Sequence, residues 1–215
     1  MANGKAIKVF DKYFKEYDEW YEENKLVYLS EVAVLRKVIP KGKKGLEIGV
    51  GTGRFAEPLG IEYGIDPSEK MLSIAKRRGV KTFVGRGERL PFSDKKFDYV
   101  ALIITLCFVE NPDEVIKEAK RVLRDNGKII IGIIDKTSFL GKFYQKKKKE
   151  GHKIYKYANF FLVKEAVDLL KRHAFKNFVF YQTLFKPLED IKEVEEPKEG
   201  FGEGSFVVIS AEKSI

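Results

Sequence analysis

The first forty residues carry apolar side chains at helical spacing. Phe10, Phe14 and Tyr17 follow one another at intervals of four and three, which predicts one apolar face of an amphipathic helix. A second helix is predicted over residues 26–38, because its apolar pattern stops just before Pro40. Two helices are therefore expected before the first strand.

From residue 45 onward, short apolar runs alternate with amphipathic segments. Five runs have the length of buried strands: residues 45–49, 63–65, 81–84, 99–104 and 128–134. Helices are predicted at residues 68–78, 112–123 and 164–173, and the glycine loop after residue 49 is expected to open another. This alternation implies parallel strands joined by helical crossovers.

Two further β-rich runs, residues 178–185 and 205–211, flank the polar and acidic segment 186–204 and are expected to pair antiparallel. The predicted fold is α/β: a single Rossmann-like, doubly wound, mostly parallel sheet of seven strands, with an antiparallel last strand at the edge and helices on both faces. Residues 1–215 are expected to form one domain, because no linker interrupts the pattern.

The composition, 44% hydrophobic and 34% charged, is typical of a globular protein, and no apolar run approaches the roughly 20 residues that span a bilayer. The N-terminus lacks the apolar core of a signal peptide. Cys107 is the single cysteine, which excludes an internal disulfide and a Cys-rich zinc site. We expect a cytoplasmic protein with no membrane insertion. Abundant Lys and Glu beside scarce Gln resemble proteins of heat-loving organisms.

The net charge of +9 could attract nucleic acid, anionic lipid or an acidic substrate. Lys and Glu are interspersed, however, which favours a solvated, salt-bridged surface. The four consecutive lysines at residues 146–149 leave the same choice open between a solvated helix face and a contact with an anion or nucleic acid.

A glycine motif directly follows the first predicted strand: Glu47-Ile48-Gly49-Val50-Gly51-Thr52-Gly53. Glycines let the backbone turn sharply and approach a ligand closely, at the carboxyl end of a strand where α/β sheets bind ligands. The alternative is a loop that merely turns the chain. A nicotinamide dehydrogenase would favour G-x-G-x-x-G, and this sequence has G-x-G-x-G instead.

Asp66 ends the second predicted strand, and its carboxylate could accept hydrogen bonds from both hydroxyls of a ribose. Asp-Pro-Ser also suits the start of a helix, so Asp66 could instead be an N-cap or turn residue. The two roles are compatible.

Four runs in order resemble the class I S-adenosylmethionine-dependent methyltransferases, especially the small-molecule group that includes quinone-biosynthesis enzymes: LEIGVGTGRF, GIDPSEKML, GRGERLPFSDKKFDYV and EVIKEAKRVLRDNGKIII. They cover residues 45–134. The resemblance implies S-adenosylmethionine as cofactor, a helical lid at residues 1–40, a cofactor-binding core at 41–135 and a substrate-side half at 136–215.

The resemblance also implies a set of cofactor-binding residues: Glu47, Gly49, Val50, Gly51, Gly53, Asp66, Pro67, Gly87, Glu88, Thr105 and Leu106. Glu47 would support the amino group of the cofactor, Asp66 would take the ribose hydroxyls, and Glu88 would lie at the adenine edge. Relatives often have Asp at the position of Arg86, and that Asp contacts the adenine amine. Arg86 departs from this pattern.

Lid or substrate residues implied by the resemblance are Tyr13, Phe14, Tyr17, Trp20, Tyr21 and Cys107. The aromatic rings could stabilise a sulfonium or a cationic amine, or could simply pack an amphipathic helix on the sheet. No metal is needed for methyl transfer. No residue is assigned as a general base, and Tyr17, Tyr21 and Asp135 are the weak candidates.

The predicted activity is methyl transfer to a small-molecule nucleophile through N, O, S or C. An RNA or protein methyltransferase is the first alternative, and a non-catalytic S-adenosylmethionine-binding protein is the second. Nucleic acid is not favoured, because Thr105-Leu106-Cys107-Phe108 stands where many base-amino methyltransferases have an Asn/Asp-Pro-Pro-aromatic motif. A monomer or a homodimer is expected.

Overall fold

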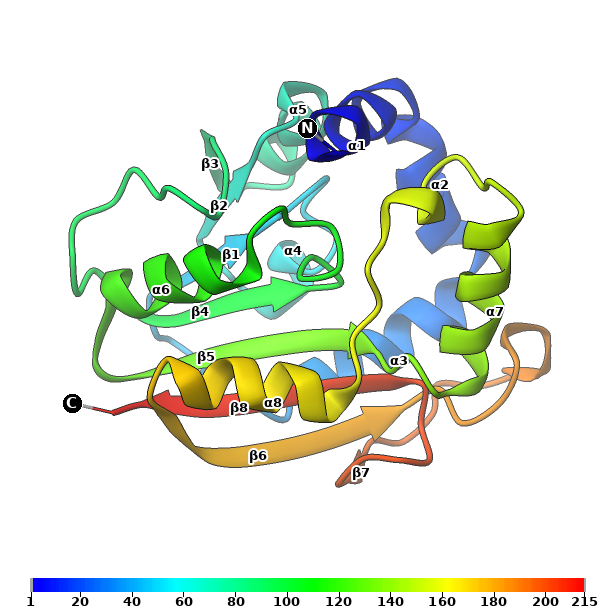
Figure 1. Ribbon diagram of the computed structural model, residues 1–215. Helices are drawn as coiled ribbons and strands as arrows, with labels where there is room; N and C mark the ends of the chain where they lie inside the picture. Colours follow the sequence, from blue (N-terminus) through cyan, green and yellow to red (C-terminus); the bar gives the residue numbers. More distant parts are fainter. Residues whose placement is uncertain (1, 215) are drawn as a thin grey trace.

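The computed structural model describes the backbone of residues 2–214 and the side chains of residues 4–214. One sheet forms its centre, with strand order β3-β2-β1-β4-β5-β8-β6-β7 (Figure 1). The strands are β1 (Gly45–Ile48), β2 (Tyr63–Asp66), β3 (Lys81–Val84), β4 (Phe97–Ile103), β5 (Leu123–Ile134), β6 (Phe175–Thr183), β7 (Lys198–Glu199) and β8 (Phe206–Lys213).

The strands from β3 to β5 run parallel, whereas β8 is antiparallel to both β5 and β6. The predicted fold class is confirmed, with two differences in the sheet. A two-residue β7 adds an eighth strand, and β8 lies between β5 and β6 instead of at the edge. Burial explains this position, because every residue of β8 except Glu212 is buried, while β6 exposes several side chains.

Helices cover both faces of the sheet. α6 (Pro112–Val122) and α8 (Val163–Arg172) pack on one face, and α3 (Lys25–Leu35), α4 (Ala56–Leu59) and α5 (Glu69–Arg77) pack on the other.

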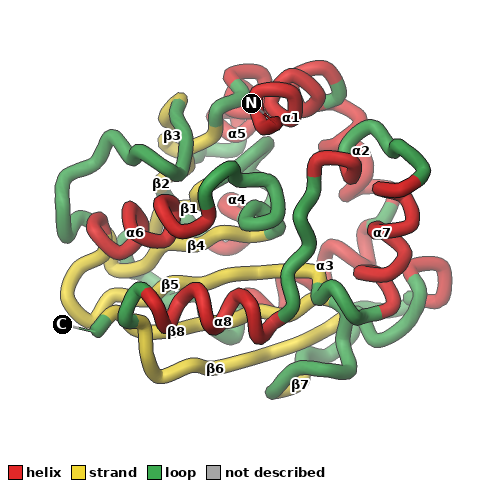
Figure 2. The backbone as a smooth tube through the Cα atoms, viewed as in Figure 1, coloured by secondary structure: helices red, strands yellow, loops and turns green. Residues whose placement is uncertain are grey.

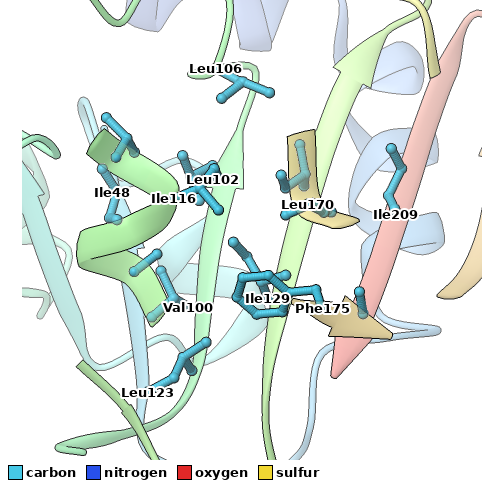
Figure 3. Packing of buried hydrophobic residues seen from close by; sticks show 14 of the residues in the cluster. Ile48, Val100, Leu102, Leu106, Ile116, Leu123, Ile129, Leu170, Phe175 and Ile209 are labelled. Atoms are coloured by element: carbon cyan, nitrogen blue, oxygen red, sulfur yellow. The ribbon is translucent and has the colours of Figure 1, made fainter. Parts of the chain in front are cut away.

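The layer under α6 and α8 is a continuous apolar cluster. Figure 3 shows Ile116 of α6 and Leu170 of α8 beside Val100, Leu102 and Ile129 of the central strands, all fully buried. Close packing of this kind fixes the strands whose ends build the site described below.

The N-terminal helix differs from the prediction. It is broken at Tyr13 into α1 (Ala2–Lys12) and α2 (Phe14–Glu23). The glycine loop does not open a helix directly either, since α4 begins only at Ala56 and has four residues. No long helix therefore stands behind the loop, whose Gly49 and Val50 amides donate to the Ile65 carbonyl oxygen at 2.8 and 3.1 Å.

Helix α7 (Phe139–Lys149) contains the lysine run in its last turn, and the rest of it is not apparent from the sequence pattern. Gly141 and three aromatic residues make its first turns weak in helix propensity. The side chain of Ser138 caps the helix by accepting from the Gly141 amide at 3.0 Å. Gly141 is required there, because a Cβ would lie 2.0 Å from the Asp135 carbonyl oxygen.

Helices α1, α2 and α7 and the 3-10 turn η1 (Tyr155–Tyr157) gather beyond the carboxyl ends of β1, β4 and β5, together with several loops (Figure 2). Within residues 2–214, none of the helices has both the length and the apolar character needed to cross a bilayer.

Candidate functional site

A cavity of about 710 Å³ opens at the carboxyl ends of the parallel strands, under α1 and α2 and beside α7. The predicted site residues that line it are Tyr13, Tyr17, Trp20, Tyr21, Gly49, Gly51, Asp66, Pro67, Gly87, Glu88, Thr105 and Cys107. The predicted residues outside its lining are Phe14, Glu47, Val50, Gly53, Leu106 and Asp135. The structure thus brings most of the predicted residues to one cavity.

The glycine loop is shaped by close approach. Gly49 has a φ of +73°, and a Cβ there would lie 2.4 Å from the Thr105 side chain. Gly51 has a φ of +52°, but its nearest side-chain neighbours would be 3.7 Å or more from a Cβ. Gly49 is therefore needed for packing against the loop after β4, and Gly51 leaves its space open to the cavity.

The carboxylate of Asp66 is 8% exposed and lies between two backbone amides. Its Oδ2 accepts from the Gly51 amide at 3.0 Å, and its Oδ1 accepts from the Ser68 amide at 2.8 Å. Burial raises the pKa of Asp66 to about 6, although both amides oppose the shift. Ser68, and not Asp66, is the N-cap of α5, so Asp66 has lone pairs left for a ligand in the cavity.

Glu47 lies in β1 below the glycine loop and is 1% exposed. Its Oε2 has no hydrogen-bond partner among the described residues. Burial, reinforced by the charge of Asp66, holds the pKa of Glu47 well above its usual range. An unpartnered buried carboxyl lowers the free energy of unfolding, so its presence here suits a ligand that brings a positive charge.

Three of the predicted residues outside the cavity lining, Gly53, Leu106 and Asp135, have structural roles. A Cβ at Gly53 would contact Ala75 of α5 at 3.1–3.2 Å, so this glycine lets the loop pack on that helix. Leu106 is 1% exposed within the apolar core. The Asp135 carboxylate accepts from the amides of Thr137 at 2.8 Å and Val163 at 3.1 Å, which makes it a turn and helix cap. The structure gives Asp135 no position from which it could act as a base.

Helix α2 is joined to the glycine loop by an ion cluster. Asp18 accepts from Arg54 at 2.8 and 2.9 Å and from Arg78 at 2.8 and 3.0 Å. Arg78 also donates to the Thr52 carbonyl oxygen at 2.7 Å. Burial opposes ionisation of Asp18, but the two guanidinium groups outweigh it and hold its pKa well below the usual range. The ion cluster therefore holds α2, which covers the cavity, against the glycine loop.

The wall under α2 is aromatic. The hydroxyls of Tyr17 and Tyr21 share a hydrogen bond of 2.8 Å, and burial raises the pKa of both. Tyr144 of α7 lies with its ring centroid 4.4 Å from that of Tyr155, and Phe160 stacks on Tyr144 at 6.4 Å. Tyr144, Tyr155 and Phe160 are not among the residues predicted from the sequence, because they follow no family motif.

Glu31 is a further cavity residue that the sequence reasoning missed. It lies on α3, is 2% exposed, and its Oε2 has no hydrogen-bond partner among the described residues. Burial alone raises the pKa of Glu31 to about 8. One acidic residue inside the otherwise apolar stretch Leu29-Ser30-Glu31-Val32-Ala33-Val34 was the available sequence indication.

Two other groups in the wall are unsuited to act as nucleophile or base. Burial raises the pKa of Cys107 to about 12, so its thiol stays neutral. The Nδ1 of His152 accepts from the amides of Ile154 at 3.3 Å and Tyr155 at 3.4 Å, which assigns the proton to Nε2. Among the described residues, no group of three or more His, Cys, Asp or Glu could hold a metal ion.

One backbone outlier borders the cavity. Ile104, directly after β4, has a φ of +52°, which is rare for a β-branched residue. Its amide donates to the Gly132 carbonyl oxygen at 2.8 Å, which holds the turn in place. Strain of this kind, roughly 1–3 kcal/mol, collects at functional sites.

Comparisons with known proteins agree with this geometry. Residues 46–131 match the family described as "Methyltransferase domain". An uncharacterized protein of Methanocaldococcus jannaschii is 54% identical over 207 residues, which cover 96% of this chain and all of that protein. A demethylmenaquinone methyltransferase of Geobacillus sp. is 32% identical over 139 residues, covering 57% of this chain and 59% of the enzyme.

A solved structure from Thermotoga maritima is described as a "SAM-dependent methyltransferase, possible histamine N-methyltransferase". It is 43% identical to this chain with a TM-score of 0.94, and the alignment covers 97% of this chain and all of that one. The fold and the relatives therefore indicate the same family. The chain belongs to the class I S-adenosylmethionine-dependent methyltransferases, and its cofactor is S-adenosylmethionine.

Proposed function

We propose that this enzyme transfers the methyl group of S-adenosylmethionine to a small-molecule nucleophile bound in the same cavity. The observation that carries the proposal is the cavity itself, which extends from Asp66 and the glycine loop to the rings of Tyr144 and Tyr155. Its volume of about 710 Å³ lies within the range of pockets that enclose small ligands, roughly 300–1,000 Å³. A folded protein or an RNA helix would need an open surface instead.

The chain's own residues suit the parts of the cofactor. Asp66 would accept hydrogen bonds from the ribose hydroxyls, and Glu47 would hold the ammonium group with its unpartnered oxygen. Pro67, Gly87 and Glu88 would border the adenine. The bound cofactor supplies an electrophilic methyl group on a sulfonium.

The protein contributes to the reaction by position. Methyl transfer is an in-line displacement, so holding donor and acceptor aligned in a dry cavity supplies most of the acceleration. The hydroxyls of Tyr17 and Tyr21 keep their protons, because their pKa values lie above the usual range. One hydroxyl donates to the other, and the proton that remains could be donated to the acceptor, so the pair would orient the acceptor and would not act as a base.

Two relatives support a small acceptor. The Thermotoga maritima protein is described as a possible histamine N-methyltransferase, and histamine is a small amine. The name of the Geobacillus enzyme gives demethylmenaquinone as its substrate, and demethylmenaquinone is also a small molecule.

Transfer from S-adenosylmethionine with a radiolabelled methyl group tests the proposal. The purified protein would be incubated with separate pools of small amines, thiols, phenols, total RNA and protein extract. Label is expected in a small-molecule pool and absent when the same pool is incubated with Asp66→Ala. Label confined to RNA or protein would overturn the proposal, and binding of the cofactor without transfer to any pool would indicate a non-catalytic binding protein.

A further inference from the structure

The lining of the cavity combines a buried carboxyl group, Glu31, with several aromatic rings. Glu31 from α3, Tyr21 from α2, Tyr144 from α7 and Tyr155 from η1 all line it. Burial raises the pKa of Tyr144 and of Tyr155, and the charge of Glu31 contributes to the rise in both. Three other elements, α2, α7 and η1, therefore line the same cavity as the acidic group of α3.

The burial of Glu31 leaves one of its carboxyl oxygens unpaired among the described residues. Its side chain is 2% exposed, and its Oε2 finds no hydrogen-bond donor among the described residues. Burying such a group costs free energy unless a donor or a cation compensates it. Since Glu31 borders the cavity, the compensating group can come from a ligand.

The nearby cations do not serve this purpose. Lys153 pairs with Glu16 and lies over the Tyr13 ring at 4.0 Å, and Lys147 lies over the Phe143 ring at 5.5 Å. The only influence that shifts the pKa of Glu31 is burial, with no contribution from a nearby lysine or arginine.

We infer that Glu31 binds the ammonium group of a small organic amine, and that this amine is the methyl acceptor of the enzyme. The inference rests on the proposed function and names its substrate class. A cavity that holds both a carboxylate and aromatic rings is a favourable site for an alkylammonium ion, because both the charge and the rings attract it. In the free protein Glu31 keeps its proton at neutral pH, because burial raises its pKa to about 8, and an ammonium ion in the cavity favours the ionised form. The carboxylate formed on binding repels carboxylic acids, phenolates and thiolates, so it selects against anionic acceptors.

The chemical step balances with Glu31 as the proton acceptor. The ammonium gives one proton to the Glu31 carboxylate and becomes a neutral amine with a free lone pair. The nitrogen then forms a bond to the methyl carbon while the carbon–sulfur bond breaks, and the bond electrons remain on sulfur as the thioether of S-adenosylhomocysteine. The product leaves as an N-methylammonium ion, and Glu31 returns its proton to solvent.

The test measures binding to the complex of the protein with S-adenosylhomocysteine, so that no turnover is required. The probes are matched pairs of amine and alcohol of increasing size: propylamine and propanol, benzylamine and benzyl alcohol, and 2-phenylethylamine and 2-phenylethanol. Wild type is expected to bind at least one amine at least tenfold more tightly than its alcohol. Glu31→Gln should reduce that ratio to less than threefold and leave the affinity for S-adenosylhomocysteine within twofold.

Glu150→Gln provides the matched control. It makes the same chemical change at an exposed position of the chain outside the cavity, and it should keep the preference of wild type. Glu31→Met, which keeps the volume without the polar group, should behave like Glu31→Gln and guards against failure of one variant to fold.

Two results would overturn the inference. One is a wild-type protein that binds no amine of the panel in preference to its alcohol. The other is a Glu31→Gln variant that keeps the preference. Failure of wild type to bind S-adenosylhomocysteine would instead refute the proposed function, so the two failures can be told apart.

Discussion

Asp66 and Glu31 are both buried carboxylates at the cavity, but backbone amides hold only Asp66. The amides of Gly51 and Ser68 favour the ionised form of Asp66 and limit the rise of its pKa to about 6, whereas nothing offsets burial at Glu31. At the scale of single residues, the two groups should therefore respond differently to pH.

Affinity for a ribose should fall in acid. Ionised Asp66 accepts hydrogen bonds from the ribose hydroxyls better than its protonated form, so binding weakens as the pH falls through about 6. The probe is 5′-methylthioadenosine, which carries the ribose but no amino group that Glu47 could bind. Calorimetry should show its dissociation constant rising up to about tenfold per pH unit below 6.

Asp66→Asn is the control for this titration, because it cannot ionise. Its affinity for 5′-methylthioadenosine should be weaker than that of wild type at pH 8 and flat with pH. The same acid dependence in Asp66→Asn would show that another group is responsible.

The stability of wild type should fall relative to Glu31→Gln as the pH rises from 5 to 8. The pKa of Glu31 is raised from the ordinary 4.5 to about 8 in the folded protein, so across this window the unfolded chain has lost a proton that the folded protein retains. Each pH unit then removes up to ~1.4 kcal/mol from the free energy of unfolding. The groups that face Glu31, namely Tyr17, Tyr21, Tyr144 and Tyr155, stay neutral throughout.

Urea unfolding at pH 5, 6, 7 and 8 checks this difference. The variant should gain a few kcal/mol over wild type by pH 8, less if water reaches the carboxylate when it ionises. Parallel curves for the two proteins would mean that Glu31 ionises as it does in water.

At the scale of elements, α2 is joined to its neighbours by charged groups. It is an amphipathic helix without a side-chain N-cap, and Asp18 joins it to Arg54 in the glycine loop and to Arg78 after α5. These ion pairs join part of the lid predicted for residues 1–40 to the glycine loop. Asp18 does not line the cavity, so its substitution removes the ion pairs without changing the lining.

Asp18→Asn should loosen α2. Two partly buried guanidinium groups lose their charged partner, which should lower the free energy of unfolding by about 2 kcal/mol and speed proteolysis within α2. S-adenosylhomocysteine should bind more weakly as well, because ordering the loop then costs more. Glu19→Gln on the same helix is exposed and should leave stability within about 0.5 kcal/mol of wild type. Equal stability of Asp18→Asn and Glu19→Gln would contradict a structural role for the cluster.

Elements with strong apolar periodicity or a family motif were predictable. The segments from β1 to β5 match most of the expected strands and helices, because each carries its own pattern, but α4 is short and β5 begins already at Leu123. The break at Tyr13 and the position of β8 were not predictable, since both follow from packing between distant segments. The first turns of helix α7 were not predicted, because Gly141 and the aromatic residues have low helix propensity. Their helical placement depends on the turn at Asp135.

For the molecule as a whole, the carboxyl ends of the parallel strands form the part of the cavity in which we propose that the cofactor binds, and α2, α3, α7 and η1 line the rest. The first half follows a motif common to the family, so Asp66, Gly51 and Glu88 could be found from sequence. Glu31 and Tyr155 come from segments 124 positions apart that no motif connects. Only the folded chain brings them to one cavity, so the amine site proposed here could not be predicted from the sequence.

The central claim is that the glycine loop and Asp66 hold an adenosyl cofactor in this cavity. Calorimetric titration of S-adenosylhomocysteine into wild type and Asp66→Ala tests it most directly. One site per chain is expected, with affinity at least tenfold weaker in Asp66→Ala because two hydrogen bonds to a charged group are lost. Absence of binding to wild type, or equal affinity in the two proteins, would contradict the account.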